Sequence, residues 1–175
     1  DQKLLYRKFN VPIIYNFRAN DILNSGTGAP LMPFLDWLLF SKINKEILTL
    51  NIGGISNITY IPKNKKRNKV IGFDTGPGMS LIDKATDKLF NKPYDMDGRL
   101  SKKGQVDFKI LNKLMGHSYI IKNPPKSTDI DEFGYNLLDQ IINNEKINSY
   151  NLIKTLTQYT IDSINYSIIK YINLE

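Results

Sequence analysis

The chain contains no cysteine and a single histidine, His117. The missing cysteines exclude disulfide bonds and thiolate metal sites, and a lone histidine excludes a histidine metal cluster within this chain. No apolar run approaches the length that crosses a membrane, and the opening residues Asp1 to Lys3 lack the basic and then apolar pattern of a secretion signal. Together these absences predict a soluble globular protein without a membrane segment.

Size and charge narrow the class further. The chain has 175 residues, of which 41% are hydrophobic and 23% charged, enough for one domain with a real core. Its net charge of +7 could indicate a nucleic-acid partner. The lysines are scattered, however, and the densest run, Lys63 to Arg67, lies between two strand-like segments and is predicted to be a solvated hairpin loop. We therefore expect no nucleic-acid partner.

The apolar pattern predicts an α/β fold in which a three-stranded antiparallel meander is followed by helices. Short connections join the strands of the meander, which favours antiparallel pairing. Strands are expected over residues 11–15, 46–52, 55–61 and 70–74, and helices over 33–40, 79–90, 104–115, 131–142 and 152–172. The last helix repeats apolar residues near helical spacing, which indicates core packing; they are Leu152, Ile153, Leu156, Ile161, Ile164, Ile168 and Ile172.

The most informative stretch is Gly72 to Gly78, where an aspartate leaves an apolar run and enters a turn rich in glycine. One interpretation is a tight turn in which Asp74 satisfies its own backbone. The other is a ligand site, because glycine lets backbone amides approach an anion, and the start of the following helix favours negative charge. Asp74 could then hold Mg²⁺ or take a proton from an attacking hydroxyl or water.

An aspartic protease is excluded, although such enzymes share the Asp-Thr-Gly tripeptide. They need two aspartates that share a proton, and this chain has no second Asp-Thr-Gly or Asp-Ser-Gly.

Three other places carry charge in loops. Arg18 either pairs with Asp21 on a helix turn or binds an anionic ligand. Lys126 follows two prolines and could lie over an anion, with Thr128 or Asp129 capping the next helix. Asp95 and Asp97 alternate as in a calcium loop, but the full calcium pattern is missing, so a turn stabilised by Asp and Gly is favoured.

Five blocks occur in an order that resembles the anhydro-N-acetylmuramic acid kinase family. The match runs from about Val11 to the final helix, and the ordered set is far more specific than any single block. The blocks are Gly26-Thr27-Gly28-Ala29-Pro30-Leu31, Asn51-Ile52-Gly53-Gly54-Ile55-Ser56-Asn57, Phe73-Asp74-Thr75-Gly76-Pro77-Gly78, Tyr94-Asp95-Met96-Asp97-Gly98 and Pro124-Pro125-Lys126-Ser127-Thr128.

The resemblance implies a fold of the sugar kinase, actin and Hsp70 type (ribonuclease H-like), with two α/β domains that close over ATP. It implies that water opens the 1,6-anhydro bond of the sugar and that the freed O6 takes the γ-phosphoryl group of ATP, which gives N-acetylmuramic acid 6-phosphate in cell-wall recycling. ATP and Mg²⁺ are the implied cofactors. The implied setting is a cytoplasmic homodimer.

The resemblance also assigns residues. Asp74 matches the catalytic base, Arg18, Asn57 and Lys126 are expected to bind the substrate, and Gly76 and Gly78 are expected near the transferred phosphate. Residues 1–45 would end the N-terminal kinase domain, and residues 46–175 would carry the catalytic aspartate.

The chain also departs from the family pattern. Asn16, Met79 and the stretch Asp129-Ile130-Asp131 stand where the family has Asp, Asn and Gly-Arg-Glu. The N-terminal phosphate loop and the C-terminal adenosine-binding region of the family are absent, so the architecture is expected to be an incomplete two-domain one, a central fragment that is inactive alone. The alternative is a degenerate, non-catalytic remnant that binds a sugar or a partner.

Overall fold

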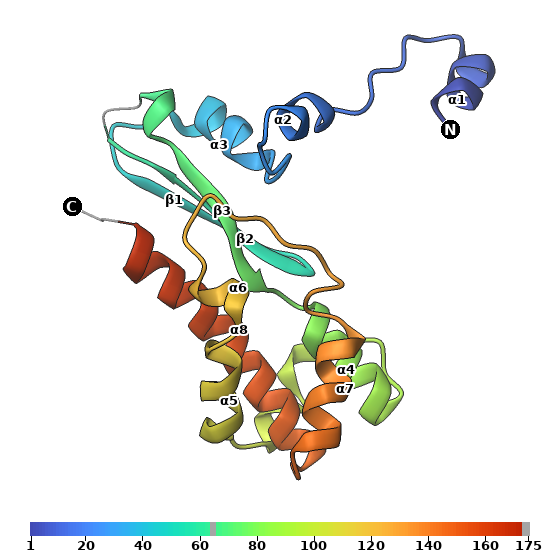
Figure 1. The fold of residues 1–175 in the computed structure, drawn as a ribbon, viewed down its shortest axis with the longest axis vertical. Helices are drawn as coiled ribbons and strands as arrows, with labels where there is room; N and C mark the ends of the chain where they lie inside the picture. Colours follow the sequence, from blue (N-terminus) through green and yellow to red (C-terminus); the bar gives the residue numbers. More distant parts are fainter. Residues whose placement is uncertain (64–65, 173–175) are drawn as a thin grey trace.

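The computed structural model describes residues 1–63 and 66–172 and confirms the α/β class, with one antiparallel sheet and a layer of helices (Figure 1). The strands are β1 (Ile47–Ile52), β2 (Ile55–Ile61) and β3 (Ile71–Pro77). The helices are α1 (Gln2–Phe9), α2 (Ala19–Leu23), α3 (Met32–Phe40), α4 (Ser80–Phe90), α5 (Phe108–Met115), α6 (Ser118–Ile121), α7 (Tyr135–Asn144) and α8 (Ser149–Tyr171), with short 3-10 turns at Arg67–Lys69, Met96–Gly98 and Ser101–Lys103.

The predicted meander is confirmed, with strand order β1-β2-β3 and both pairs antiparallel. Side chains alternate between the two faces of the sheet, so the pairing register decides which residues share a face. One face buries Ile58, Tyr60 and Phe73 against Ile168 of α8 and Ile172 directly after it. The apolar alternation of the strands therefore finds its partner in the end of the last helix.

The other face of the sheet is covered by α3 at one end only. Thr49 of β1 donates a hydrogen bond to the buried Asp36 of α3 (Oγ1 to Oδ2, 2.8 Å), and Pro33 lies against Gly72 of β3. Towards the other end of this face lies a row of polar residues, described below. Figure 1 shows α3 and α8 on opposite sides of the sheet.

A second, larger core lies among the helices α4, α5, α7 and α8. Its buried residues include Leu81, Ile110, Leu138 and Leu156. Helix α8 contributes to both cores, which confirms the interpretation of its apolar residues as core packing. For one of these seven residues the prediction is wrong: Ile161 is 52% exposed, because it lies on the outer side of the helix.

Several predicted boundaries are corrected. Residues 11–15 form no strand; they include Pro12, which cannot donate to a ladder, and they have no strand beside them among the described residues. Helix α5 begins only at Phe108, because the Asp107 carboxylate caps it by accepting from the Ile110 amide at 3.1 Å. Strand β3 continues through Pro77, so the expected turn is part of the sheet.

Helix α7 also begins later than predicted. Asp129 accepts hydrogen bonds from the amides of Asp131 and Glu132, both at 3.0 Å, and this forms a separate turn. The helix starts beyond it, at Tyr135, after Gly134. Asp129 therefore caps a turn, and not the helix for which it was predicted.

The predicted loop from Lys63 to Arg67 includes residues 64 and 65, which lie outside the described residues. No helix in the described part of the chain has the length and apolar character that crossing a bilayer requires.

Candidate functional site

Asp74 is the central residue of β3, on the face of the sheet that α3 covers at one end only. Only 6% of the residue is exposed. Its carboxylate oxygen Oδ2 accepts two hydrogen bonds, from the Ser127 hydroxyl at 2.9 Å and from the Thr128 amide at 3.0 Å. The other oxygen, Oδ1, has no hydrogen-bond partner among the residues the structure describes. The carboxylate is thus held by one oxygen and keeps the other available to accept a proton.

Opposing influences act on the pKa of Asp74. Burial raises the pKa above its ordinary value of 3.8, because a buried carboxylate loses its hydration. The hydrogen bonds from Thr128 and Ser127 lower it, as do the positive charges of Arg18 and Lys126. Burial prevails, and the carboxyl group is a stronger base than an exposed aspartate.

The pairing of the strands places two asparagines beside Asp74. Asn57 of β2 is its direct partner across the β2–β3 pair, and Asn51 of β1 is the partner of Asn57. Directly opposed residues in antiparallel strands point to the same face, so the three polar side chains form one row across the sheet. An irregularity between Ser56 and Asn57 sets this register, because β3 has one extra residue there. The predicted substrate contact Asn57 therefore lies next to the predicted base.

Lys126 lies behind Asp74 rather than beside its carboxylate. It is 1% exposed, and its Nζ donates to the carbonyls of Tyr119 and Ile120 at 3.2 and 3.0 Å. Its main chain pairs with β3, where the Asp74 amide donates to the Lys126 carbonyl at 3.3 Å. In this structure the ammonium faces the interior, so a direct contact with a substrate would require the loop to move.

Gly76 and Gly78 are used for close packing. A Cβ on Gly78 would lie 2.2 Å from the Gly53 carbonyl oxygen, and one on Gly76 would lie 2.8 Å from Ile120. The backbone of Gly76 also has a φ of 144°, which side chains disfavour. These glycines let the β3–α4 connection touch its neighbours closely.

The same packing occupies the amides at the start of α4. The amides of Gly78 and Ser80 donate to the Gly54 carbonyl at 2.9 and 3.2 Å, and the Met79 amide donates to the Gly53 carbonyl at 2.8 Å. A helix N-terminus binds a phosphate through backbone amides that have no other partner. In this structure the three amides are engaged by the β1–β2 turn, and the expected place of Gly76 and Gly78 near a phosphate stays a prediction.

Arg18 does not pair with Asp21. The Asp21 carboxylate accepts instead from the Gly28 amide at 2.7 Å, and no ion pair joins Arg18 and Asp21 within the described residues. Arg18 is exposed just before α2, close enough for its charge to lower the pKa of Asp74. The ion pair with Asp21 is therefore not formed, and the contact of Arg18 with an anionic ligand stays a prediction.

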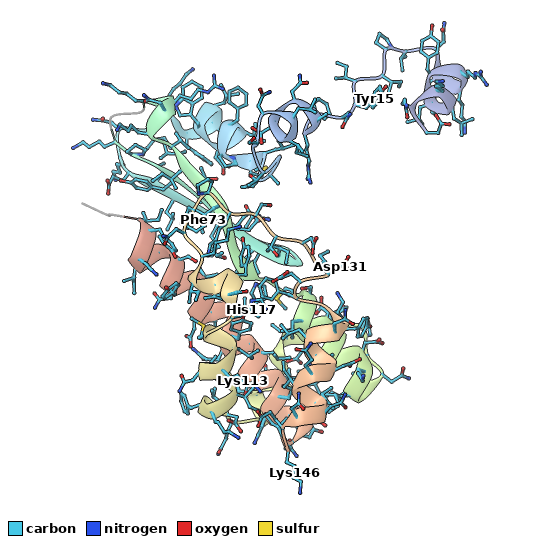
Figure 2. The ribbon with its side chains drawn as sticks, in the orientation of Figure 1. Tyr15, Phe73, Lys113, His117, Asp131 and Lys146 are labelled. Carbon is cyan, nitrogen blue, oxygen red and sulfur yellow. The ribbon has the colours of Figure 1, made fainter. Side chains whose placement is uncertain are left out.

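Sequence reasoning missed the parts played by Tyr119, Ser127 and Thr128. The Tyr119 hydroxyl donates to the Asp74 carbonyl at 2.8 Å. Asp74 is therefore held through its backbone as well as through its side chain. Ser127 and Thr128 were part of a recognised block, but nothing in the sequence paired them with an aspartate more than fifty residues away. For Tyr119 the sequence carried no signal. Figure 2 labels Phe73 on β3 and His117 just before α6, the two elements that the Tyr119 contact joins; Ser127 and Thr128 lie in the segment after α6.

The remaining acidic candidates are structural. Asp95 accepts from the amides of Leu100 and Ser101 at 2.7 and 2.9 Å, which confirms the turn that was favoured over a calcium loop. Burial opposes ionisation there, but the bonds prevail and lower the pKa of Asp95. Among the described residues, no three His, Asp or Glu side chains gather as a metal site would require.

The raised pKa of Asp74 predicts a measurable dependence of stability on pH. Between 3.8 and the higher folded pKa, the folded state binds more protons than the unfolded state, so the free energy of unfolding falls as pH rises. Asp74→Asn keeps an oxygen for Ser127 and Thr128 but cannot ionise. We expect the variant to gain stability relative to the wild type as pH rises.

Urea unfolding of both proteins in steps from about pH 4 to about pH 7 measures this difference. If the two stability curves stay parallel over that range, the pKa of Asp74 is not raised by folding.

Comparison with known proteins gives a consistent result. The family model described as anhydro-N-acetylmuramic acid kinase matches residues 1–173. A protein of that name from Clostridioides difficile (strain 630) is 43% identical over 164 residues, which are 93% of this chain and 43% of the relative. One from Bacillus thuringiensis subsp. konkukian (strain 97-27) is 40% identical over the same proportions. The chain thus spans less than half the length of these curated relatives.

Proposed function

Because the chain belongs to the anhydro-N-acetylmuramic acid kinase family, we propose that it forms the part of an ATP-dependent kinase that carries the catalytic base. The reaction proposed for the complete protein opens 1,6-anhydro-N-acetylmuramic acid with water and phosphorylates O6, in the recycling of cell-wall material. The observation that supports it best is the Asp74 carboxylate, buried, held by Oδ2 and open at Oδ1, in a row with Asn57.

The proposed chemistry assigns one proton transfer to this chain. Oδ1 of Asp74 takes a proton from water, and the water oxygen bonds to C1 of the sugar. The bond between C1 and O6 breaks, its electron pair goes to O6, and O6 bonds to the γ-phosphorus of ATP while ADP leaves. A base with a raised pKa that is fixed by Ser127 and Thr128 suits the first step, because general bases work best when their geometry is set and their pKa lies towards the working pH.

Two further residues are proposed to contact the sugar. Asn57 is the direct cross-strand neighbour of Asp74, and no hydrogen bond of its side chain occurs among the described residues. Its amide can therefore donate to and accept from sugar hydroxyls. Arg18 brings an exposed guanidinium to the same region, suited to the carboxylate of the muramic acid lactyl group.

The nucleotide and its metal need more than this chain provides. The amides of Gly78, Met79 and Ser80 are engaged by the β1–β2 turn, and the described residues hold no cluster of metal ligands. Magnesium bound to nucleotides keeps several waters and needs only one or two carboxylates besides the phosphates. The residues present do not form a magnesium site by themselves, and we propose that ATP and Mg²⁺ are held mainly by regions of the complete protein that this chain does not include.

The homodimer and the cytoplasmic setting implied by the family are proposals of the same kind. So is the division near residue 45. It is consistent with the position of the two apolar cores, whose buried members lie at Ile58 and beyond.

The proposal predicts that the purified chain alone shows no ATP-dependent phosphorylation of the anhydro sugar, whereas the complete gene product does. Release of ADP and of the 6-phosphate product measures both. Turnover by the 175 residues alone would refute the proposed division of labour. A complete product that binds the sugar without turnover would be the degenerate remnant and would refute the catalytic assignment.

A further inference from the structure

Lys126 is the most deeply buried charged residue near Asp74. Its side chain lies on the face of the sheet opposite to the Asp74 carboxylate, with 1% of the residue exposed. A buried ammonium group is costly unless its protons are satisfied. Here two of them reach the carbonyls of Tyr119 and Ile120, in the short helix α6.

Three aromatic rings surround the same ammonium. Its Nζ lies 4.9 Å from the ring centre of Tyr119, 5.4 Å from that of Tyr171 and 5.8 Å from that of Phe73. The faces of such rings attract cations, and the attraction is stronger where water is excluded. One side chain therefore joins α6, the end of α8 and β3.

The segments that Lys126 joins are those that hold Asp74. Tyr119 accepts from Lys126 through its carbonyl and donates through its hydroxyl to the Asp74 carbonyl. Lys126 itself accepts from the Asp74 amide, and the next two residues, Ser127 and Thr128, bind the Asp74 carboxylate. Lys126 is thus connected to Asp74 in two ways, through Tyr119 and through residues 126–128 of its own segment.

We propose that Lys126 is a positioning residue, whose buried ammonium locks α6 and residues 126–128 onto β3 so that Ser127 and Thr128 hold the Asp74 carboxylate in its reactive orientation. The importance of that orientation rests on the proposed function of Asp74. This role differs from the substrate contact predicted from the sequence, and it explains why a cation lies where no substrate can reach it in this structure.

Burial and the neighbouring charges shift the pKa of the Lys126 ammonium group. Burial lowers the pKa of Lys126 to about 8, and the neighbouring charges of Lys170 on α8 and Lys122 after α6 lower it as well. Asp74 on β3 opposes them. Loss of hydration raises the pKa of the buried Tyr119 and of the half-buried Tyr171, which also face the group, so both stay neutral there.

Lys126→Met tests the proposal, since it keeps an apolar stem and removes the charge and the donors. In the 175-residue chain, we expect the Thr128 amide to exchange its hydrogen at least about tenfold faster, because it loses the support that orders its loop. We also expect the pKa of Asp74 to rise, because one positive charge and the order of its donors are lost. Amide exchange and the titration of the Asp74 carboxyl group, both by NMR, give the two results.

The matched control is Lys146→Met, which removes an exposed lysine far from the site (Figure 2). Both readouts should match the wild type in the control. If Lys126→Met leaves the exchange of Thr128 and the pKa of Asp74 unchanged, the proposal is overturned. A lysine that only stabilised the fold would lower the unfolding midpoint and speed the exchange of all protected amides alike, without a selective effect on the Thr128 amide. Loss of the charge alone would raise the pKa of Asp74 without faster exchange at Thr128.

The wild-type chain offers a test that does not depend on the folding of a variant. The ammonium protons of Lys126 should be protected from exchange at neutral pH, because two of them are hydrogen-bonded in a buried site, whereas those of Lys146 should not. Rapid exchange of both would overturn the proposal. The exchange and titration results test the positioning role even if Asp74 proves not to be the base. If Asp74 is the base, Lys126→Met in the complete enzyme should lower kcat with little change in KM.

Discussion

Replacing Asp74 with asparagine is expected to lower turnover of the anhydro sugar by about a thousandfold in the complete gene product, within the range that general base catalysis contributes. Asparagine keeps an oxygen that can accept from Ser127 and Thr128, so the local structure should persist. It cannot take a proton from water. Binding of the sugar should change little, because the contacts proposed for Arg18 and Asn57 remain.

Steady-state kinetics together with calorimetric binding of the sugar separate the two effects. A matched control is Asp97→Asn, the same chemical change at an exposed aspartate that forms an ion pair with the exposed Arg99 at 3.2 Å. The control should turn over at the wild-type rate. Near-normal turnover by Asp74→Asn would show that another group activates the water, whereas a loss of sugar binding as large as the loss of rate would make Asp74 a binding residue.

Gly78→Ala is expected to destabilise the fold by about 3 kcal/mol, at the upper end of the usual cost of overpacking. The added Cβ would lie 2.2 Å from the Gly53 carbonyl oxygen. No side-chain rotation can relieve this clash, because the backbone fixes the positions of both atoms. Separating the two turns would break the bonds that the amides of Gly78 and Met79 donate to the Gly54 and Gly53 carbonyls. The same movement would disturb β3, the strand that carries Asp74.

Urea denaturation measures the cost, and Gly53→Ala is the control from the other side of the same contact. A Cβ on Gly53 would meet its nearest atom, the Ile55 carbonyl oxygen, at 3.6 Å, which is an ordinary contact. That variant should change the free energy of unfolding by less than about 1 kcal/mol. Equal midpoints for Gly78→Ala and the wild type would mean that the two turns are not packed as this structure has them.

The strands and most of the helices could be predicted from local patterns. The alternation in residues 47–52 and 55–61 and the two glycines between them were enough for the hairpin. The apolar repeat of the last helix predicted α8 to within a few residues at its start and one at its end. The predictions of these elements were correct because the pattern that indicates each one lies within the segment itself. Residues 11–15 failed for the converse reason: an apolar run predicts a strand only if another strand lies beside it.

The candidate site was predicted in part. The glycine-rich stretch singled out Asp74, and the predicted meander placed Asn57, a member of a recognised block, on the neighbouring strand. The partners of Asp74 could not be found in this way, since Tyr119, Ser127 and Thr128 approach it from a distant part of the chain. The amides after Asp74 were expected to be free for a phosphate, but the β1–β2 turn accepts from them, and only the packing of two turns reveals this.

By itself the sequence determined the α/β class, the order of the strands and the family, and it singled out Asp74 as the candidate base, because each depends on residue types and on spacing along the chain. The tertiary structure alone decided what that carboxylate meets: which of its oxygens is free, which side of the sheet Lys126 faces, and which amides are already engaged. The physical reason is that hydrogen bonds and burial join groups by distance in space, and between Asp74 and Thr128 that distance is 3.0 Å across fifty-four positions of sequence.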